Sequence, residues 1–230
     1  MNVRREGCAD MHDTNMPDQV KYQKLFMGII LASFTHELRN QLATVKELSG
    51  LQQDRIAVDR TVQDVPGLVT ALKSVDEQVD HAIQLISFLN RFAHRMDSEE
   101  SFYSVVNALD ELMVLVRRLA RQKSVMLETD FAASIPRIVG SPADLQMLVF
   151  FLLDEKIRGL PPGGTILVRA REEHGGVMVT IGSSGAAPEG GDHDSRCPRS
   201  VLLSVAGAMG AEVIDSDDGQ ETGIVLRGAW

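Results

Sequence analysis

The chain has 230 residues, of which 44% are hydrophobic and 24% are charged, as is usual for a protein with a buried core. Its formal net charge of -9 makes nucleic acid and anionic membranes poor partners, because both attract clustered Lys and Arg. Cys8 and Cys197 fit neither a metal-ligand spacing nor a disulfide framework, so we expect a reducing, cytoplasmic location. The N-terminus shows no secretory signal, and the longest apolar runs, 28–34 and 147–153, are too short to span a bilayer.

The first part of the chain predicts a mobile tail over residues 1–17 and an antiparallel helical hairpin over residues 18–98. Apolar residues recur at steps of three and four from about 18 to 53 and from about 68 to 96, which places them on one face of each helix. The two stripes are Leu31, Phe34, Leu38, Leu42, Val45 and Leu48, and Leu72, Val75, Val79, Ala82, Ile86, Leu89 and Ala93. Aspartates, Pro66 and Gly67 predict a loop over residues 54–67. Two helices of about 45 Å cannot bury both stripes against each other, so we predict a homodimeric four-helix bundle.

Residues 99–230 predict a second domain of helices and short strands. The expected order is helix 105–122, strand 124–129, helix 142–160, strands 165–171 and 177–181, helix 199–209, and strands 212–215 and 223–227. Ser141, Pro142 and Asp144 form a typical helix start, and the run of Pro and Gly at 161–164 ends that helix. This order predicts a mixed sheet with helices on one face, so the expected fold class is α+β.

His36 stands out in the first predicted helix. It lies two residues from Phe34 and from Leu38, so it is rotated by about 200° from the apolar stripe and should face the solvent. An exposed imidazole titrates near neutral pH and can act as a nucleophile. Glu37 offers a carboxylate beside the ring, and Asn40 lies one turn further along the same face. The other histidines form no pair with metal-ligand spacing, so we expect no metal site.

The segment from Phe34 to Ala43, FTHELRNQLA, resembles the phosphoacceptor box of bacterial sensor histidine kinases, S-H-E-L-R-N-P-L, with Gln41 in place of the usual proline. The resemblance implies that His36 is phosphorylated, that Glu37 assists proton transfer and that Asn40 positions water. We expect Arg39 and Gln41 to contact the partner. Without the proline, the helix should be straighter just past the histidine.

Residues 99–230 resemble the ATP-binding domain of the same kinases, in element order and in the segments 138–145 and 160–166. The residues that would bind ATP are absent. Alignment on the Pro-Pro-Gly-Gly exit places Phe151 and Glu155 where the family has two asparagines. Residues 183–187 replace the aspartate loop, and residues 196–198 replace the glycine-rich loop. We therefore expect a degenerate α/β sandwich without a nucleotide cofactor.

These features predict a phosphorelay histidine phosphotransferase, a phosphoryl carrier rather than an autonomous ATP-dependent kinase. His36 would take a phosphoryl group from the aspartate of one response-regulator receiver domain and pass it to another, with Mg²⁺ supplied by the receiver. Three alternatives remain open. The chain could be a receiver phosphatase acting through Glu37 and Asn40, a non-catalytic dimeric scaffold of the pseudo-histidine-kinase type, or a kinase with an unorthodox nucleotide site.

Overall fold

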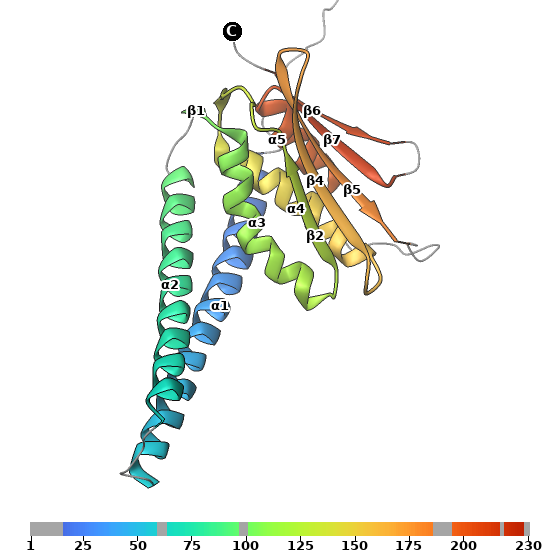
Figure 1. The fold of residues 1–230 in the computed structure, drawn as a ribbon. Helices are drawn as coiled ribbons and strands as arrows, with labels where there is room; N and C mark the ends of the chain where they lie inside the picture. The colour runs from blue at the N-terminus through green and yellow to red at the C-terminus, as the bar shows by residue number, and fades with distance from the viewer. Residues whose placement is uncertain (1–15, 59–63, 97–100, 186–194, 217–218, 228–230) are drawn as a thin grey trace, which may run out of the picture. The chain divides into compact units, whose positions relative to one another are not determined.

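The computed structural model describes residues 16–58, 64–96, 101–185, 195–216 and 219–227 (Figure 1). The expected mobile tail, apart from its last two residues, lies outside these ranges. The described chain divides into two compact units. One contains residues 29–97, and the other joins the residues up to Gly28 with those from Ser98 onward. The second unit therefore includes the start of the first helix, which we had assigned to the hairpin domain.

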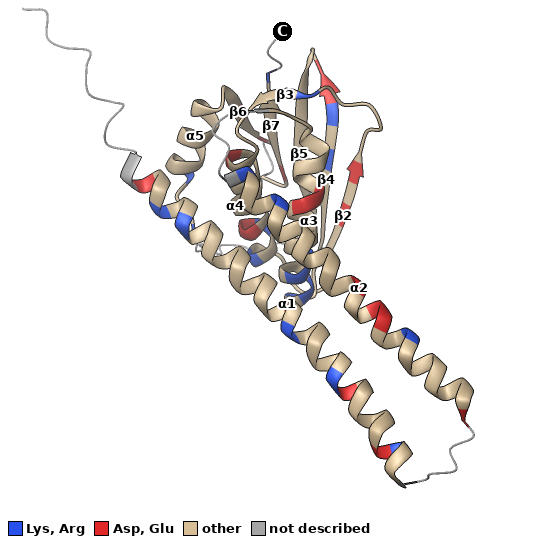
Figure 2. Cartoon of the chain, turned by 90° about the vertical axis from the view of Figure 1, so that its left-hand side faces the viewer, with Lys and Arg blue, Asp and Glu red and all other residues tan. Residues whose placement is uncertain are grey.

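The hairpin consists of α1 (Met16–Val58) and α2 (Val65–Met96), which run side by side in opposite directions (Figures 1 and 2). Both helices extend into the predicted loop. Asp64 caps α2, since its side-chain Oδ1 accepts a hydrogen bond from the Gly67 backbone N–H at 2.9 Å. Pro66 lies in the first turn, where no intrahelical N–H is required of it. The Asp, Pro and Gly that we interpreted as a loop are thus the start of a helix.

Helix α2 carries two apolar seams, each with mostly alternating steps of three and four residues. The inner seam is buried or half-buried. Its apolar members are Leu68, Ala71, Val75, Ala82, Leu85, Leu89 and Phe92, and the polar Gln78 occupies one further position. The outer seam is exposed, and it contains Val65, Val69, Leu72, Val79, Ile83 and Ile86. The predicted single stripe combined members of both. One face of α2 is therefore covered within the chain, and a second apolar face is left open.

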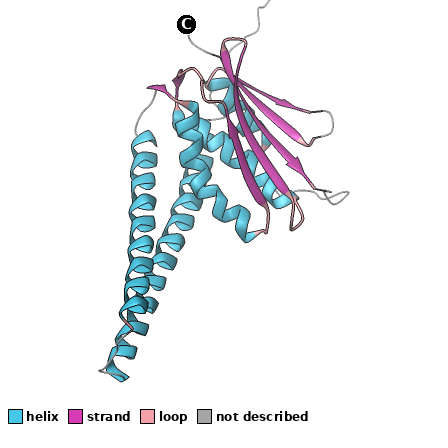
Figure 3. Ribbon diagram, in the orientation of Figure 1, coloured by secondary structure: helices cyan, strands magenta, loops and turns pink. Residues whose placement is uncertain are grey.

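The second unit is an α/β sandwich (Figure 3). Its helices are α3 (Val105–Gln122), α4 (Pro142–Gly159) and α5 (Arg199–Ala208), which lie on the same face of the main sheet (Figure 1). Its strands are β1 (Ser101–Tyr103), β2 (Met126–Phe131), β3 (Ile138–Gly140), β4 (Thr165–Glu173), β5 (Gly176–Ser184), β6 (Ala211–Asp215) and β7 (Glu221–Leu226). The predicted fold class is confirmed.

The main sheet has the order β2-β4-β5-β7-β6, with β2 parallel to β4 and the other pairs antiparallel. Alternate residues of the central strands face the helices and are buried, among them Ile166, Val168, Val179, Ile181 and Ile224. A separate two-stranded sheet pairs β1 with β3, and sequence periodicity did not predict either strand.

Helix α4 is the centre of this core. Nearly every side chain from Pro142 to Asp154 is buried, as expected for a helix that is apolar on several faces. Ser141 caps it by accepting a hydrogen bond from the Asp144 N–H at 3.1 Å, which confirms the predicted helix start. The first turns of α1 belong to the same unit and place Tyr22 and Phe26 against Phe150 and Phe151 of α4.

Candidate functional site

His36 lies on an exposed surface of α1, as the apolar period predicted. Asn40, one turn later, is also exposed, and Glu37 is half-buried. Helix α1 is unbroken through residues 34–43, and two side-chain hydroxyls in or next to this segment add hydrogen bonds to its backbone carbonyls. Thr35 Oγ1 donates to the Leu31 carbonyl at 2.7 Å, and Thr44 Oγ1 donates to the Asn40 carbonyl at 3.1 Å. The imidazole is thus presented to solvent from a regular backbone.

Arg39 and Gln41, which we expect to contact a partner, differ in their surroundings. Arg39 is exposed. Gln41 is half-buried, and its Oε1 atom is buried without a hydrogen-bond partner among the described residues. The replacement of the usual proline by Gln41 leaves α1 a continuous α-helix at this point. The sequence did not predict that this amide would face inward.

The positions aligned with the two nucleotide-binding asparagines have a different chemistry. Phe151 is only 2% exposed, and its ring centroid lies 6.2 Å from Tyr22 and 6.3 Å from Phe26. Glu155, one turn later, is half-buried. An aromatic ring offers no hydrogen-bonding group to a nucleotide, and a carboxylate repels a phosphate unless a cation lies between them.

Asp154 adds a buried charge next to these positions. Its side chain is 8% exposed and pairs with Arg158 at 3.0 Å and with Arg196 at 3.5 Å. Burial raises the pKa of this carboxyl, and the Arg158 guanidinium opposes that shift. Arg196 lies just before α5, so the pair connects α4 to the segment that leads into α5. Sequence periodicity could not predict this contact, because the two residues lie far apart in the chain.

The segments that replace the family's two nucleotide loops are engaged in contacts within the chain. Ser183 Oγ donates to the Gln220 carbonyl at 3.1 Å. Pro198 precedes α5 without a side-chain cap and has no N–H to offer a phosphate. Lys156 Nζ donates to the carbonyls of Gly219 and Gln220 at 3.3 and 3.0 Å, and burial lowers its pKa. Residues 186 and 187 lie outside the described ranges.

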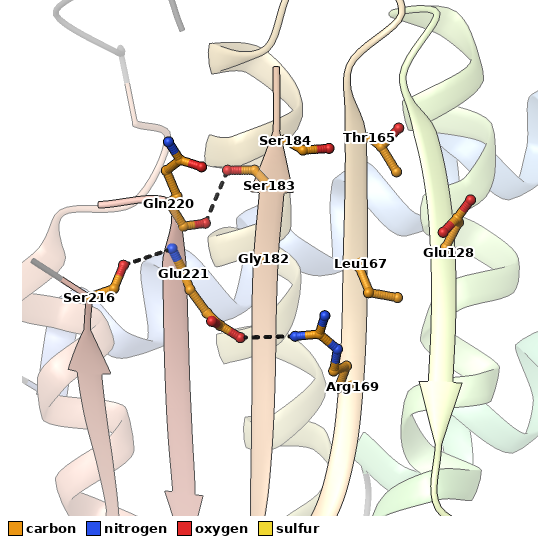
Figure 4. Close-up of a pocket in the computed structure, with 10 residues that line it drawn as sticks. All are labelled: Glu128, Thr165, Leu167, Arg169, Gly182, Ser183, Ser184, Ser216, Gln220 and Glu221. Carbon is orange, nitrogen blue, oxygen red and sulfur yellow. Dashed lines mark hydrogen bonds and ion pairs between the residues drawn. The ribbon is translucent and has the colours of Figure 1, made fainter. Parts of the chain in front are cut away.

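The opposite face of the sheet has a shallow hollow of about 430 Å³ (Figure 4). Arg169 on β4 and Glu221 on β7 form an ion pair of 3.4 Å across β5. Gly182 lies between them, where an added Cβ would have only the Leu167 carbonyl within 4 Å, at 3.9 Å. An added methyl group at Gly182 would therefore meet neither side chain of this pair, and the hollow follows from a solvated sheet face.

Within the described part of the chain, no group of three or more His, Cys, Asp or Glu side chains could hold a metal ion. None of the helices described is long and apolar enough to cross a bilayer.

No model of a known protein family matches the chain. Curated relatives are cell-division control histidine kinases named PdhS. That of Brucella suis is 24% identical over 164 residues, 67% of this chain and 15% of that protein, and that of Brucella anthropi is 25% identical over 157 residues, 65% of this chain and 14% of that protein. The chain thus spans about one seventh of the length of these relatives.

Solved structures with a similar arrangement are also histidine kinases. Acinetobacter baumannii AdeS is 15% identical, with 84% of this chain and 97% of that chain covered and a TM-score of 0.46. A complex of the histidine kinase ThkA with the response regulator TrrA has 13% identity, covers 96% of this chain and 68% of that chain, and has a TM-score of 0.48. The sequence relatives confirm that this chain resembles sensor histidine kinases.

Proposed function

We propose that the chain is a histidine phosphotransferase of a two-component phosphorelay, which carries a phosphoryl group on His36 between receiver domains without binding ATP. The observation that carries this proposal is the contrast between two positions. The phosphoacceptor histidine is exposed on a regular helix, whereas the position aligned with a nucleotide-binding asparagine is a buried phenylalanine, Phe151.

The transfer consists of two balanced steps. An imidazole nitrogen of His36 attacks the phosphorus of an aspartyl phosphate, a P–N bond forms, and the P–O bond to the receiver carboxylate breaks. The proton displaced from the ring passes to Glu37 or to water, and the released carboxylate keeps the electron pair. In the second step, a carboxylate oxygen of another receiver's aspartate attacks the phosphorus, a P–O bond forms and the P–N bond breaks. The imidazole keeps the electron pair of the broken bond and takes up a proton from Glu37 or water. Mg²⁺ would come from the receiver, and this chain supplies the positioned nucleophile.

The open outer seam of α2 supports a homodimer as the active form. Its side chains are 40–62% exposed, with Val65 at 62% and Leu72 at 58%. Such a seam matches the core positions of a helical bundle, and a second copy offers the same seam by symmetry. We propose that two hairpins associate through these residues into a four-helix bundle that presents two copies of His36.

Asn40 supports a second candidate, hydrolysis of the receiver's aspartyl phosphate. Its amide is exposed one turn from His36, where it could hold a water molecule. In this alternative, His36 does not become phosphorylated.

A phosphotransfer assay separates these functions. A receiver labelled with ³²P on its aspartate is incubated with wild type, His36→Ala and the control His81→Ala, which changes an exposed histidine on α2. We expect label on the wild type and on the control, none on His36→Ala, and onward transfer to an unlabelled second receiver.

The same assay contains the contradicting outcomes. Label released as free phosphate by wild type and His36→Ala alike, but not by Asn40→Ala, would favour hydrolysis. Label that reaches His36 directly from γ-³²P-ATP would overturn the proposal that the chain does not use ATP. A receiver whose label is unchanged by any variant would indicate a scaffold.

A further inference from the structure

The first turns of α1 are attached to the second unit by two aromatic anchors. We call residues 18–28 the strap. Among its side chains only Tyr22 and Phe26 are buried, at 9% and 0% exposure, and the others are exposed or half-buried. The anchors are four residues apart, so they project from the same face of α1. An attachment of this kind concentrates its stabilising free energy in a few central rings.

The receiving surface is the aromatic face of α4. Phe150 and Phe151 are 0% and 2% exposed, and their ring centroids lie 5.3 Å apart. The Phe26 ring lies 5.0 Å from Phe150, and the Tyr22 ring meets Phe151 edge to face, with an interplanar angle of 88°. Aromatic pairs favour tilted and edge-to-face arrangements at these separations, so the four rings form a continuous packed cluster.

The strap covers a surface that the sheet cannot cover. The buried positions of α4 include Phe150, Phe151, Leu152 and Leu153, which point in different directions around the helix, while the sheet lies on one side of it. With the strap removed, two adjacent phenylalanines would be exposed on α4 as an apolar patch. The strap belongs to the same compact unit although it precedes α4 by more than a hundred residues.

We propose that the aromatic face of α4 is a helix-docking site and that its occupant is the chain's own strap, anchored by Tyr22 and Phe26. Recognition follows the helix-in-groove mode, in which side chains at positions i and i+4 insert into an apolar surface. Because the attachment rests on two rings, the strap can detach while the sheet stays folded. The strap is part of α1, the helix that also carries His36, ten residues after Phe26. This inference does not depend on phosphotransfer.

Hydrogen exchange of the full-length chain tests the docking from both sides. The variants are Phe26→Ala in the strap, Phe151→Ala in α4 and the control Leu25→Ala, whose side chain is 38% exposed. We expect both phenylalanine variants to accelerate amide exchange of residues 18–28 by about tenfold or more, because each removes one partner of the same aromatic contact. Leu25→Ala should leave this exchange unchanged, and peptides 166–170 and 177–181 should keep their protection in all three.

Three outcomes would overturn the proposal. The first is unchanged exchange of the strap in Phe151→Ala. The second is an equal loss of protection in the strap and in β4 and β5, which would mean that the strap is an inseparable part of the core. Exchange of the wild-type strap that depended on protein concentration would assign the occupant to a second copy and would equally overturn the intramolecular proposal.

A labelled peptide tests the recognition directly. A peptide of residues 16–30 is titrated against the full-length Tyr22→Ala/Phe26→Ala variant and against wild type. We expect saturable binding only to the variant, whose site is vacated, and none by a peptide that itself carries Phe26→Ala. Equal binding of both peptides, or no binding to a variant that retains its circular dichroism spectrum, would contradict the proposal.

Discussion

Asp154 illustrates how the surroundings of a residue in the second unit determine its pKa and its ion pairs. Its carboxylate is almost fully buried and lies between the guanidinium groups of Arg158 and Arg196. Removing a charge from water costs free energy, and an ion pair recovers only part of that cost. The pKa of Asp154 is raised because burial outweighs the opposing effect of the Arg158 guanidinium. We therefore expect the Asp154 ion pairs to fix the position of α4 against the residues before α5, and to add little to the free energy of unfolding.

Replacing Asp154 by asparagine tests this balance. At pH 7 we expect the free energy of unfolding of Asp154→Asn to stay within about 1 kcal/mol of wild type, because the cost of the buried charge disappears together with its pairs. In wild type the folded-state pKa lies above the ordinary value of 3.8, so the folded chain holds the proton more tightly. Stability of wild type relative to the variant should therefore rise as pH falls through the folded-state pKa toward 3.8.

Urea denaturation of both proteins at several pH values between 7 and 4 provides the measurement. Ser200→Ala, an exposed substitution on α5, serves as a control whose free energy of unfolding should depend on pH as that of wild type does. A relative stability of wild type that declined on acidification would mean that the carboxylate is stabilised by its arginines, contrary to the expected sign.

For single residues, the sequence predicted the properties that follow from helical periodicity. It did not predict the properties that depend on contacts between residues far apart in the chain. Periodicity alone predicted the exposure of His36, because rotation along a helix is set by neighbours in sequence. It could not predict the buried amide oxygen of Gln41 or the pairing of Asp154 with Arg196, since these depend on elements packed from elsewhere in the chain. The catalytic roles of His36, Glu37 and Asn40 stay predictions.

The N-termini of α3 and α4 are capped by serine side chains that accept hydrogen bonds from backbone N–H groups. Ser104 accepts from the Asn107 N–H at 3.3 Å, and Ser141 accepts from the Asp144 N–H at 3.1 Å. Without these oxygens, the first turns of α3 and α4 would leave donors without protein partners.

Removal of either cap should destabilise the second unit. We expect Ser104→Ala and Ser141→Ala each to lower the free energy of unfolding by about 1 kcal/mol, while Ser200→Ala changes it by less than about 0.5 kcal/mol. The midpoint of urea unfolding, followed by far-ultraviolet circular dichroism, measures the difference. An equal effect of all three substitutions would show that the capping oxygens add nothing.

Elements with a strong period or a clear cap were predicted nearly in full, including α3 and the start of α4. The strands β1 and β3 were missed because three residues show no alternation and their pairing joins segments about thirty-five residues apart. The start of α2 was misplaced because Asp, Pro and Gly serve both loops and helix starts. The hydrogen bonds from the Gly67 N–H to the Asp64 carboxylate and from the Leu68 N–H to the Asp64 carbonyl distinguish the two interpretations.

The hairpin as a whole leaves its outer seam uncovered within one chain. Charged residues of both signs occur along α1 and α2 (Figure 2), so no large field of one sign opposes self-association. Exposed apolar side chains at heptad spacing are unfavourable in water unless another helix covers them.

A charge placed in this seam should prevent dimerisation. We expect Ile83→Lys to convert the proposed dimer into a monomer, as measured by light scattering after size-exclusion chromatography, because burying an unpaired ammonium in a helical interface costs several kcal/mol. Its control is Gln84→Lys, which adds the same charge at the exposed neighbouring position. A wild-type chain that elutes as a monomer at micromolar concentration would contradict the dimer itself.

Among the strands that the structure describes, only β2 and β4 pair in parallel, which has a consequence for the order in which the second unit folds. The strands β4 and β5 adjoin in sequence, as do β6 and β7, so each pair closes over a short loop and can assemble early. The connection from β2 to β4 contains β3 and the whole of α4, because two parallel neighbours need a crossover between them. We therefore expect β2 to pair with β4 only after this crossover has formed. The β2 edge of the sheet should therefore be the slowest to gain protection during refolding, and until then the edge of β4 stays open to pairing with other chains.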